Sequence, residues 1–168
     1  MILYIVRHAI AVPASRSEEE DSRRPLTPKG RRKMLRIARG LKKLQAQIDL
    51  ILTSPYLRAA ETGGILAKTI GLNEDQVVSN EHLSPAGYPD RLVHDINAEF
   101  GNQSSIALIG HEPSLTSLVA VLLSGDPTLS VTLKKGGVCK LSTDRLLYDR
   151  CATFEWLLSP AQLAEIGA

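Results

Sequence analysis

Short apolar runs alternate with amphipathic segments along most of this chain. The first run, ILYIV at residues 2–6, is β-branched and apolar on both faces, which is typical of a strand in the middle of a parallel sheet. Similar runs recur at intervals of about 25 to 50 residues, with two more near the end of the chain. We expect strands at residues 2–6, 49–54, 76–80, 104–110, 138–142 and 152–159.

The segments between the early strands have the spacing of helices. Thr27 and Pro28 suit the N-cap and first position of a helix whose apolar residues (Met34, Ile37, Ala38, Leu41 and Leu44) recur every three to four positions. Further helices are expected from Ser54, as cap, with Pro55 as first residue, over residues 89–100, and from residue 111 to Gly125. The charged segment at residues 14–24 is predicted to be an exposed loop, placed where a lid could lie.

This alternation of strand and helix predicts an α/β fold. We expect a three-layer sandwich in which a mainly parallel central sheet is covered by helices on both faces. Residues 1–168 show no repeat, low-complexity segment or linker, so a single domain is expected.

Composition and charge restrict the classes of partner. The charged fraction is 23%, and the net charge of +2 is too small to indicate nucleic-acid or membrane binding. Seven basic residues between positions 31 and 43 leave a surface that binds nucleic acid as an alternative. The longest apolar stretch, residues 115–123, is about half of what a membrane span needs. Cys139 and Cys151 are expected to be free core thiols, and a cytoplasmic location is expected.

Cationic side chains follow three of the predicted strands. Arg7 and His8 end the first strand, Ser54 and Arg58 follow the second, and His111 follows the strand at 104–110. Ligands bind at the carboxyl ends of the strands in open α/β sheets, so we expect these residues to share one pocket.

Such a pocket has the chemistry of a phosphoryl site. The guanidinium group of arginine can donate two parallel hydrogen bonds to phosphate oxygens. Nearby arginines also disfavour the charged form of His8, which leaves a neutral imidazole that can act as a nucleophile. Arg7, Arg58 and His111 would then stabilise the transferring group. No cluster of carboxylates or third zinc ligand accompanies them, so neither a metal nor another cofactor is expected.

Four segments in order resemble the motifs of the histidine phosphatase (phosphoglycerate mutase-like) superfamily. They are LYIVRHAIA, LTPKG, SPYLRAAET and GHEP. The resemblance implies that His8 accepts the phosphoryl group and that Arg7, Arg58 and His111 form the phosphate pocket. The short chain, R-H-A in place of R-H-G, and GHEPSL most resemble the SixA-type phosphohistidine phosphatases.

One departure from the larger family bears on the substrate. Phosphomonoesterases and mutases of that family use an acid in the middle of the chain, whereas here Leu83 is followed by Ser84 and Pro85. An imidazole leaves more readily than an alkoxide, so a phosphohistidine substrate needs less proton donation. Glu81 could replace the missing acid, and His82 could touch substrate beside the pocket.

We therefore expect a metal-independent phosphatase that hydrolyses phosphohistidine on a protein, such as a histidine phosphotransfer domain. Ser54 and Glu81 are included among the substrate-binding candidates, although a helix cap is the simpler role for Ser54. The alternatives are a small-molecule phosphomonoesterase that uses Glu81, and a regulatory module that binds phosphate without catalysis.

Overall fold

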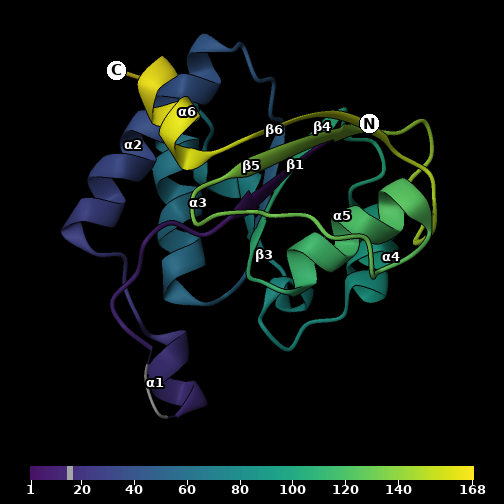
Figure 1. Ribbon diagram of the computed structural model, residues 1–168, viewed down its shortest axis with the longest axis horizontal. Helices are drawn as coiled ribbons and strands as arrows, with labels where there is room; N and C mark the ends of the chain where they lie inside the picture. Colours follow the sequence, from purple (N-terminus) through teal and green to yellow (C-terminus); the bar gives the residue numbers. More distant parts are fainter. Residues whose placement is uncertain (15–16) are drawn as a thin grey trace.

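The computed structural model describes residues 1–14 and 17–168, whose centre is a six-stranded sheet (Figure 1). Its strands are β1 (Ile2–Arg7), β2 (Leu50–Thr53), β3 (Val77–Ser79), β4 (Ser105–Gly110), β5 (Val138–Ser142) and β6 (Thr153–Leu158). Their order in the sheet is β3-β2-β4-β1-β5-β6. The first four strands pair in parallel, whereas β5 and β6 pair antiparallel, which confirms the mainly parallel sheet.

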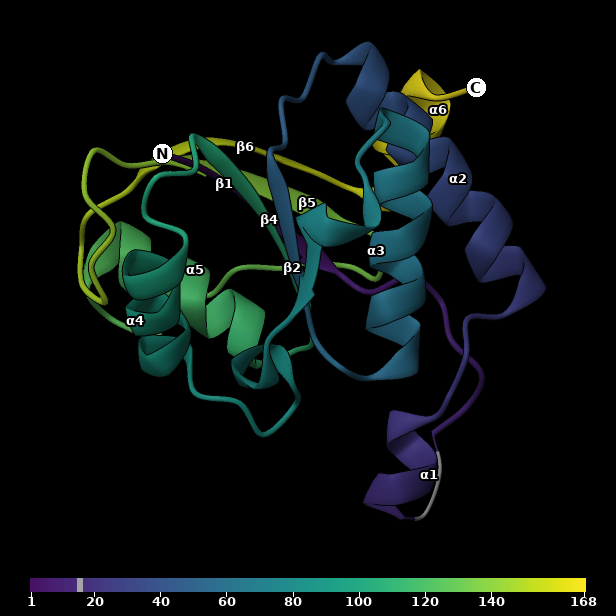
Figure 2. The ribbon, with the colours of Figure 1, turned by 180° about the vertical axis from the view of Figure 1, so that it is seen from behind.

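Helices cover both faces of the sheet, as predicted (Figure 2). One face carries α2 (Pro28–Lys43), α3 (Leu57–Ile70) and α6 (Pro160–Ile166), and the other carries α4 (Pro89–Glu99) and α5 (Ser114–Ser124). Two single-turn 3₁₀ helices, Glu74–Gln76 and Glu81–Leu83, flank β3. The three-layer architecture expected from the sequence is therefore confirmed.

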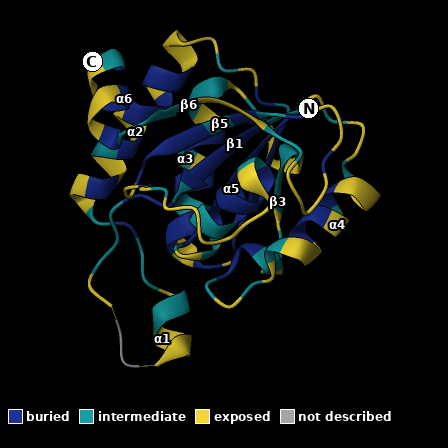
Figure 3. Cartoon of the chain, turned by 45° about the vertical axis from the view of Figure 1, so that its right-hand side comes forward, coloured by how far each residue is buried: buried dark blue, intermediate teal, exposed yellow. Residues whose placement is uncertain are grey.

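Alternate residues of each central strand enter different cores. In β1, Leu3 and Ile5 pack toward α4 and α5, whereas Tyr4 and Val6 pack toward α2, α3 and α6. Because both faces of the strand are buried, its sequence is a continuous apolar run instead of an alternating one. Figure 3 shows this buried sheet between helices that expose their outer faces.

Several predicted boundaries are wrong. The segment expected to be a loop contains a short helix, α1 (Glu18–Ser22), which Ser17 caps by accepting a hydrogen bond from Glu20 N. Residues 15 and 16 of that predicted loop lie outside the described residues. The helix expected from residue 111 begins only at Ser114, and α6 was not predicted.

The helix expected from Ser54 and Pro55 begins at Leu57, with Tyr56 at the N-cap. Ser54 N donates to Ile109 O at 2.8 Å, and this bond keeps the chain attached to β4 beyond the end of β2. The Ser54 side chain accepts a hydrogen bond from Tyr56 N at 3.2 Å, which forms a turn before the helix. Ser54 therefore shapes the turn between β2 and α3 and does not cap the helix.

Other predictions about the chain hold in the described residues. Thr27 caps α2, with Pro28 at its first position, and Gly125 ends α5 with a φ of 79°. Cys139 and Cys151 are both free, the first fully buried and the second partly buried. Among residues 1–14 and 17–168, no helix combines the length and the apolar character that crossing a membrane requires.

Candidate active site

His8 lies immediately after β1, at the carboxyl edge of the sheet. Its backbone N–H donates to Gly110 O of β4 at 3.1 Å, so the two central strands fix its position. The His8 Nδ1 atom lies 2.7 Å from Ala9 O. Since a carbonyl can only accept, this contact places the ring proton on Nδ1 and leaves Nε2 with a free electron pair.

His8 is held neutral by its surroundings. Burial, followed by the positive charges of Arg58, Arg7 and Lys135, outweighs the hydrogen bond to Ala9 and lowers the pKa of His8 to about 4. The residue as a whole is only 6% exposed. An uncharged Nε2 is thus present throughout the neutral pH range. The sequence predicted a neutral ring from the nearby arginines, whereas burial is the larger cause.

Arg58 lies in the first turn of α3 and is 3% exposed. Its Nε donates toward His8 Nε2 across 3.4 Å. The guanidinium carbon also lies 5.1 Å from the centre of the Tyr56 ring, a cation–π distance. His8, which follows the first strand, and Arg58, in the helix after the second strand, thus come into contact, as expected.

His111 follows β4, and its ring centre lies 5.0 Å from that of His8. Its Nε2 lies 2.9 Å from the Ser54 hydroxyl. Burial, the neighbouring His8 and Arg58 lower the pKa of His111 to about 3. Nδ1 of this ring is buried and has no hydrogen-bond partner among the described residues.

Arg7 is the last residue of β1. One of its terminal nitrogens, Nη1, donates to Leu133 O at 2.9 Å, which ties it to the loop before β5. Its Nε is buried and, within the described chain, has no hydrogen-bond partner. Arg7 therefore retains one buried N–H that can bind an oxyanion. Nδ1 of His111 can do the same as an N–H, in the tautomer whose Nε2 accepts from the Ser54 hydroxyl.

A second layer of residues holds this arrangement. Thr62 donates to Arg58 O at 2.7 Å and accepts from Ala9 N at 3.1 Å, so the segment after His8 is bonded to the helix that carries Arg58. On the other side, the Thr27 hydroxyl donates to Ile10 O at 3.3 Å and accepts from Gly30 N at 2.9 Å. These bonds give a physical reason for the last threonine of SPYLRAAET and for the threonine of LTPKG.

Gly30 completes the second layer. A Cβ built on this residue would lie 2.0 Å from Ile10 O, so any side chain would push α2 away from the segment that follows His8. The glycine of LTPKG is thus required by the close approach of a helix to a backbone carbonyl.

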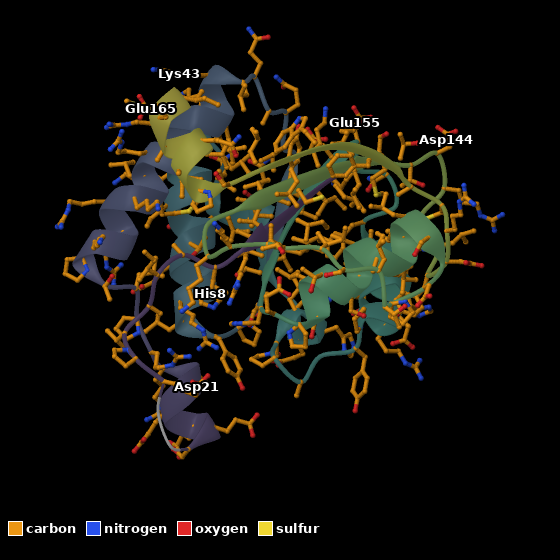
Figure 4. The ribbon with its side chains drawn as sticks, viewed as in Figure 1. His8, Asp21, Lys43, Asp144, Glu155 and Glu165 are labelled. Atoms are coloured by element: carbon orange, nitrogen blue, oxygen red, sulfur yellow. The ribbon has the colours of Figure 1, made fainter. Side chains whose placement is uncertain are left out.

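The short helix α1 lies outside the layers and next to the site (Figure 4). Asp21 contacts Arg58 with both its carboxylate and its backbone carbonyl, and Glu18 accepts a hydrogen bond from the Tyr56 hydroxyl at 3.2 Å. The segment suggested as a lid is therefore joined to the site by polar contacts in this structure.

The structure places the remaining predicted residues around this pocket. Ser54 is fully buried (0% exposed) behind His111, and it contacts that ring. Glu81 and His82 line a neighbouring cavity of about 290 Å³, which Tyr56 also borders. The nearest polar partners of these two side chains lie outside the pocket: Ser84 Oγ is 3.5 Å from the Glu81 carboxylate, and the Asp95 carboxylate is 3.8 Å from His82 Nε2.

Four residues near the site escaped the sequence analysis: Asp21, Arg24, Tyr56 and Lys135. Asp21 and Arg24 belong to the segment predicted to be a loop, and Lys135 belongs to a connection without a periodic pattern. Of the four, Tyr56 could have been inferred from the sequence, because it lies two residues before Arg58 in the segment SPYLRAAET.

The residues that converge at the site are mostly cations and histidines. Across residues 1–14 and 17–168, no group of three or more His, Cys, Asp or Glu side chains is arranged to hold one. The residues that do converge are cations and neutral imidazoles, which suit an anion.

Comparison with known proteins identifies the family of this chain. The family model of the histidine phosphatase superfamily (branch 1) matches residues 3–84, which include Arg7, His8 and Arg58. The chain is 31% identical over 166 residues to the phosphohistidine phosphatase SixA of Escherichia coli (strain K12), covering 97% of this chain and 96% of that protein. The chain therefore belongs to the histidine phosphatase superfamily, among its SixA-like members.

Two further similarities support this assignment. An uncharacterised protein of Picosynechococcus is 34% identical over 143 residues, which is 84% of each chain. A solved structure of the protein histidine phosphatase SixA complexed with tungstate superposes with a TM-score of 0.83 at 28% identity, covering 97% of this chain and 99% of that one. The fold and the family resemblance inferred from the sequence are both confirmed.

Proposed function

We propose that this protein hydrolyses phosphohistidine on a protein substrate and that His8 is the nucleophile. The observation that carries the proposal is a buried, neutral imidazole whose Nε2 faces Arg58 and whose Nδ1 is fixed by Ala9 O. Similarity to proteins named phosphohistidine phosphatase and protein histidine phosphatase supports this substrate class.

The reaction has two displacement steps. His8 Nε2 attacks phosphorus, the N–P bond of the substrate breaks, and the electron pair stays on the leaving imidazole nitrogen. Water then attacks phosphorus of the phosphorylated His8, releasing orthophosphate and returning the electron pair to Nε2. Arg7, Arg58 and His111 bind the oxygens of the transferring group, where charge is spread in the transition state.

The residues after Glu81 support a nitrogen leaving group over an oxygen one. Leu83, Ser84 and Pro85 supply no acid, and Glu81 lines the neighbouring cavity with its carboxylate beside Ser84. An imidazole departs without strong proton donation, whereas an alkoxide requires it. Glu81 is nevertheless the residue that would serve if the substrate were a small phosphomonoester.

A protein partner is proposed because the pocket is bordered by a short helix and by surface turns. Glu18 of α1 and six of the residues between Glu81 and Tyr88 line the cavity next to Tyr56. A histidine side chain on the surface of another protein, such as a histidine phosphotransfer domain, can reach a site at such a rim. The two free cysteines support placing this activity in the reducing cytoplasm.

The test compares a phosphohistidine-bearing protein with a simple phosphomonoester, with and without a chelator. Turnover of the first alone, lost in His8→Ala and retained with chelator, is the expected result. The control is His94→Ala, which removes an exposed histidine on α4. Fast ester hydrolysis would instead favour a phosphomonoesterase that uses Glu81, and phosphate binding without turnover would favour a regulatory module.

A further inference from the structure

Arg58 is held by a residue outside the sequence motifs. Its Nη1 donates to Asp21 O at 2.7 Å, and its Nη2 lies 3.0 Å from Asp21 Oδ2. The Arg58 side chain is 4% exposed and that of Asp21 is 23% exposed, so this pair is largely shielded from water. It is therefore stronger than an ion pair on the open surface.

The geometry of the contact leaves the catalytic edge of the arginine free. A guanidinium carries five N–H groups in a planar fork. Asp21 takes one N–H from each terminal nitrogen, at the end of the fork. The remaining edge, with Nε, faces His8 Nε2 at 3.4 Å, which is the side on which a phosphoryl group transferred to His8 would lie.

Asp21 is itself fixed in orientation and charge. Arg24 Nε lies 2.8 Å from Asp21 Oδ1, and Arg24 Nη1 donates to Val12 O at 2.7 Å, which anchors the pair to the segment after β1. Burial favours the neutral acid, but the hydrogen bond and charges of Arg24 and Arg58 outweigh it and hold the pKa of Asp21 below its usual value. Asp21 thus remains an anion and is unsuited to donate a proton.

We propose that Asp21 is a positioning residue for the phosphoryl-transfer step, which rests on the proposed function. Its carboxylate and carbonyl hold the end of the Arg58 fork, and they set the Nε edge at the angle that the transferring oxygens require. Because α1 has no buried residue, these polar contacts also determine where α1 lies. The segment at 17–24 is then part of the catalytic architecture.

The experiment compares Asp21→Ala and Asp21→Asn with wild type, using phosphoramidate as a simple N-phosphoryl donor. The matched control is Glu19→Ala, because Glu19 lies on the same helix and pairs only with the exposed Arg23 (2.9 Å) among the described residues. Three quantities are measured: kcat and KM, the affinity for orthophosphate, and the ¹⁵N-detected Nε–H resonance of Arg58.

We expect Asp21→Ala to lower kcat on the order of 10-fold with a smaller change in KM, since misplacing a group by about 1 Å can cost up to 10²-fold. Asp21→Asn should recover part of the rate, because its amide oxygen can still accept from Nη2. The Arg58 Nε–H resonance should shift or broaden in Asp21→Ala and stay unchanged in Glu19→Ala.

Two outcomes would overturn the inference. Faster turnover with tighter orthophosphate binding in Asp21→Ala would mean that Asp21 blocks the site. A lower melting temperature with unchanged kinetics and an unchanged Arg58 resonance would mean a structural role only. If wild type turns over no N-phosphoryl donor, the proposed function fails, and the resonance alone still decides whether Asp21 fixes Arg58.

Discussion

The buried state of His8 should make the protein lose stability in mild acid. Folding lowers the pKa of this imidazole from 6.5 to about 4, so between these values the unfolded chain binds a proton that the folded chain does not. The free energy of unfolding therefore falls as the pH falls from about 6.5 toward 4. The loss ends below the folded value, where both states are protonated.

The size of the effect follows from the two values. Between about pH 7 and pH 5, linkage gives a loss of roughly 2 kcal/mol from His8 alone. His8 is 6% exposed, so solvent screening reduces this figure little. His111 contributes in the same direction, since its pKa is also lowered, to about 3.

Urea denaturation at a series of pH values measures the effect, with His8→Gln as the perturbation. The variant cannot take up the proton, so its unfolding free energy should change by roughly 2 kcal/mol less than that of wild type over this range. The carboxylates contribute equally to both proteins and cancel. His94→Gln, which removes an exposed ring, should keep the wild-type slope. Equal slopes for wild type and His8→Gln would refute the reasoning.

Three substitutions test the layer behind the site. In denaturant titrations, Gly30→Ala should lower the unfolding free energy by roughly 3 kcal/mol, because the new Cβ would meet a backbone carbonyl. Gly64→Ala is the control: a Cβ at this helical position would have no atom within 4 Å, so the unfolding free energy should rise by about 0.5–1 kcal/mol. Thr62→Val should cost about 1–3 kcal/mol by leaving a buried backbone N–H unpaired, with Thr62→Ser restoring most of it; equal stability of the two would contradict the assigned bond. Ser54→Ala should lower kcat about 10-fold, with little change in KM, by releasing the ring of His111, and unchanged kcat would exclude that role.

The sequence predicted the sheet because the strands are buried on both faces. A short, β-branched apolar run such as residues 2–6 favours a central strand. Ligands bind at the carboxyl ends of such strands, and this rule predicted that Arg7, His8, Arg58 and His111 lie together. The structure adds the hydrogen bond from His8 Nδ1 to Ala9 O, which fixes the tautomer of the ring.

The parts that escaped prediction depend on tertiary contacts without a periodic signal. Helix α1 has only five residues and buries none of them, so no apolar pattern marks it. Ser54 followed by proline has the local pattern of a helix start, but the bond from Ser54 N to Ile109 O delays the helix. The contact between Asp21 and Arg58 joins residues 37 positions apart, which no local rule detects.

The bonds around His8 also make the pocket a late product of folding. Arg58 meets His8 across 50 positions, Ser54 meets His111 across 57, and Arg7 meets Leu133 across 126. Closing such long loops costs chain entropy before the contacts repay it, and parallel strand pairs form slowly for the same reason. Oxyanion affinity should then return only after far-ultraviolet signals of helix have recovered, so a phosphate-binding assay would report the completion of the native sheet and not merely the collapse of the chain.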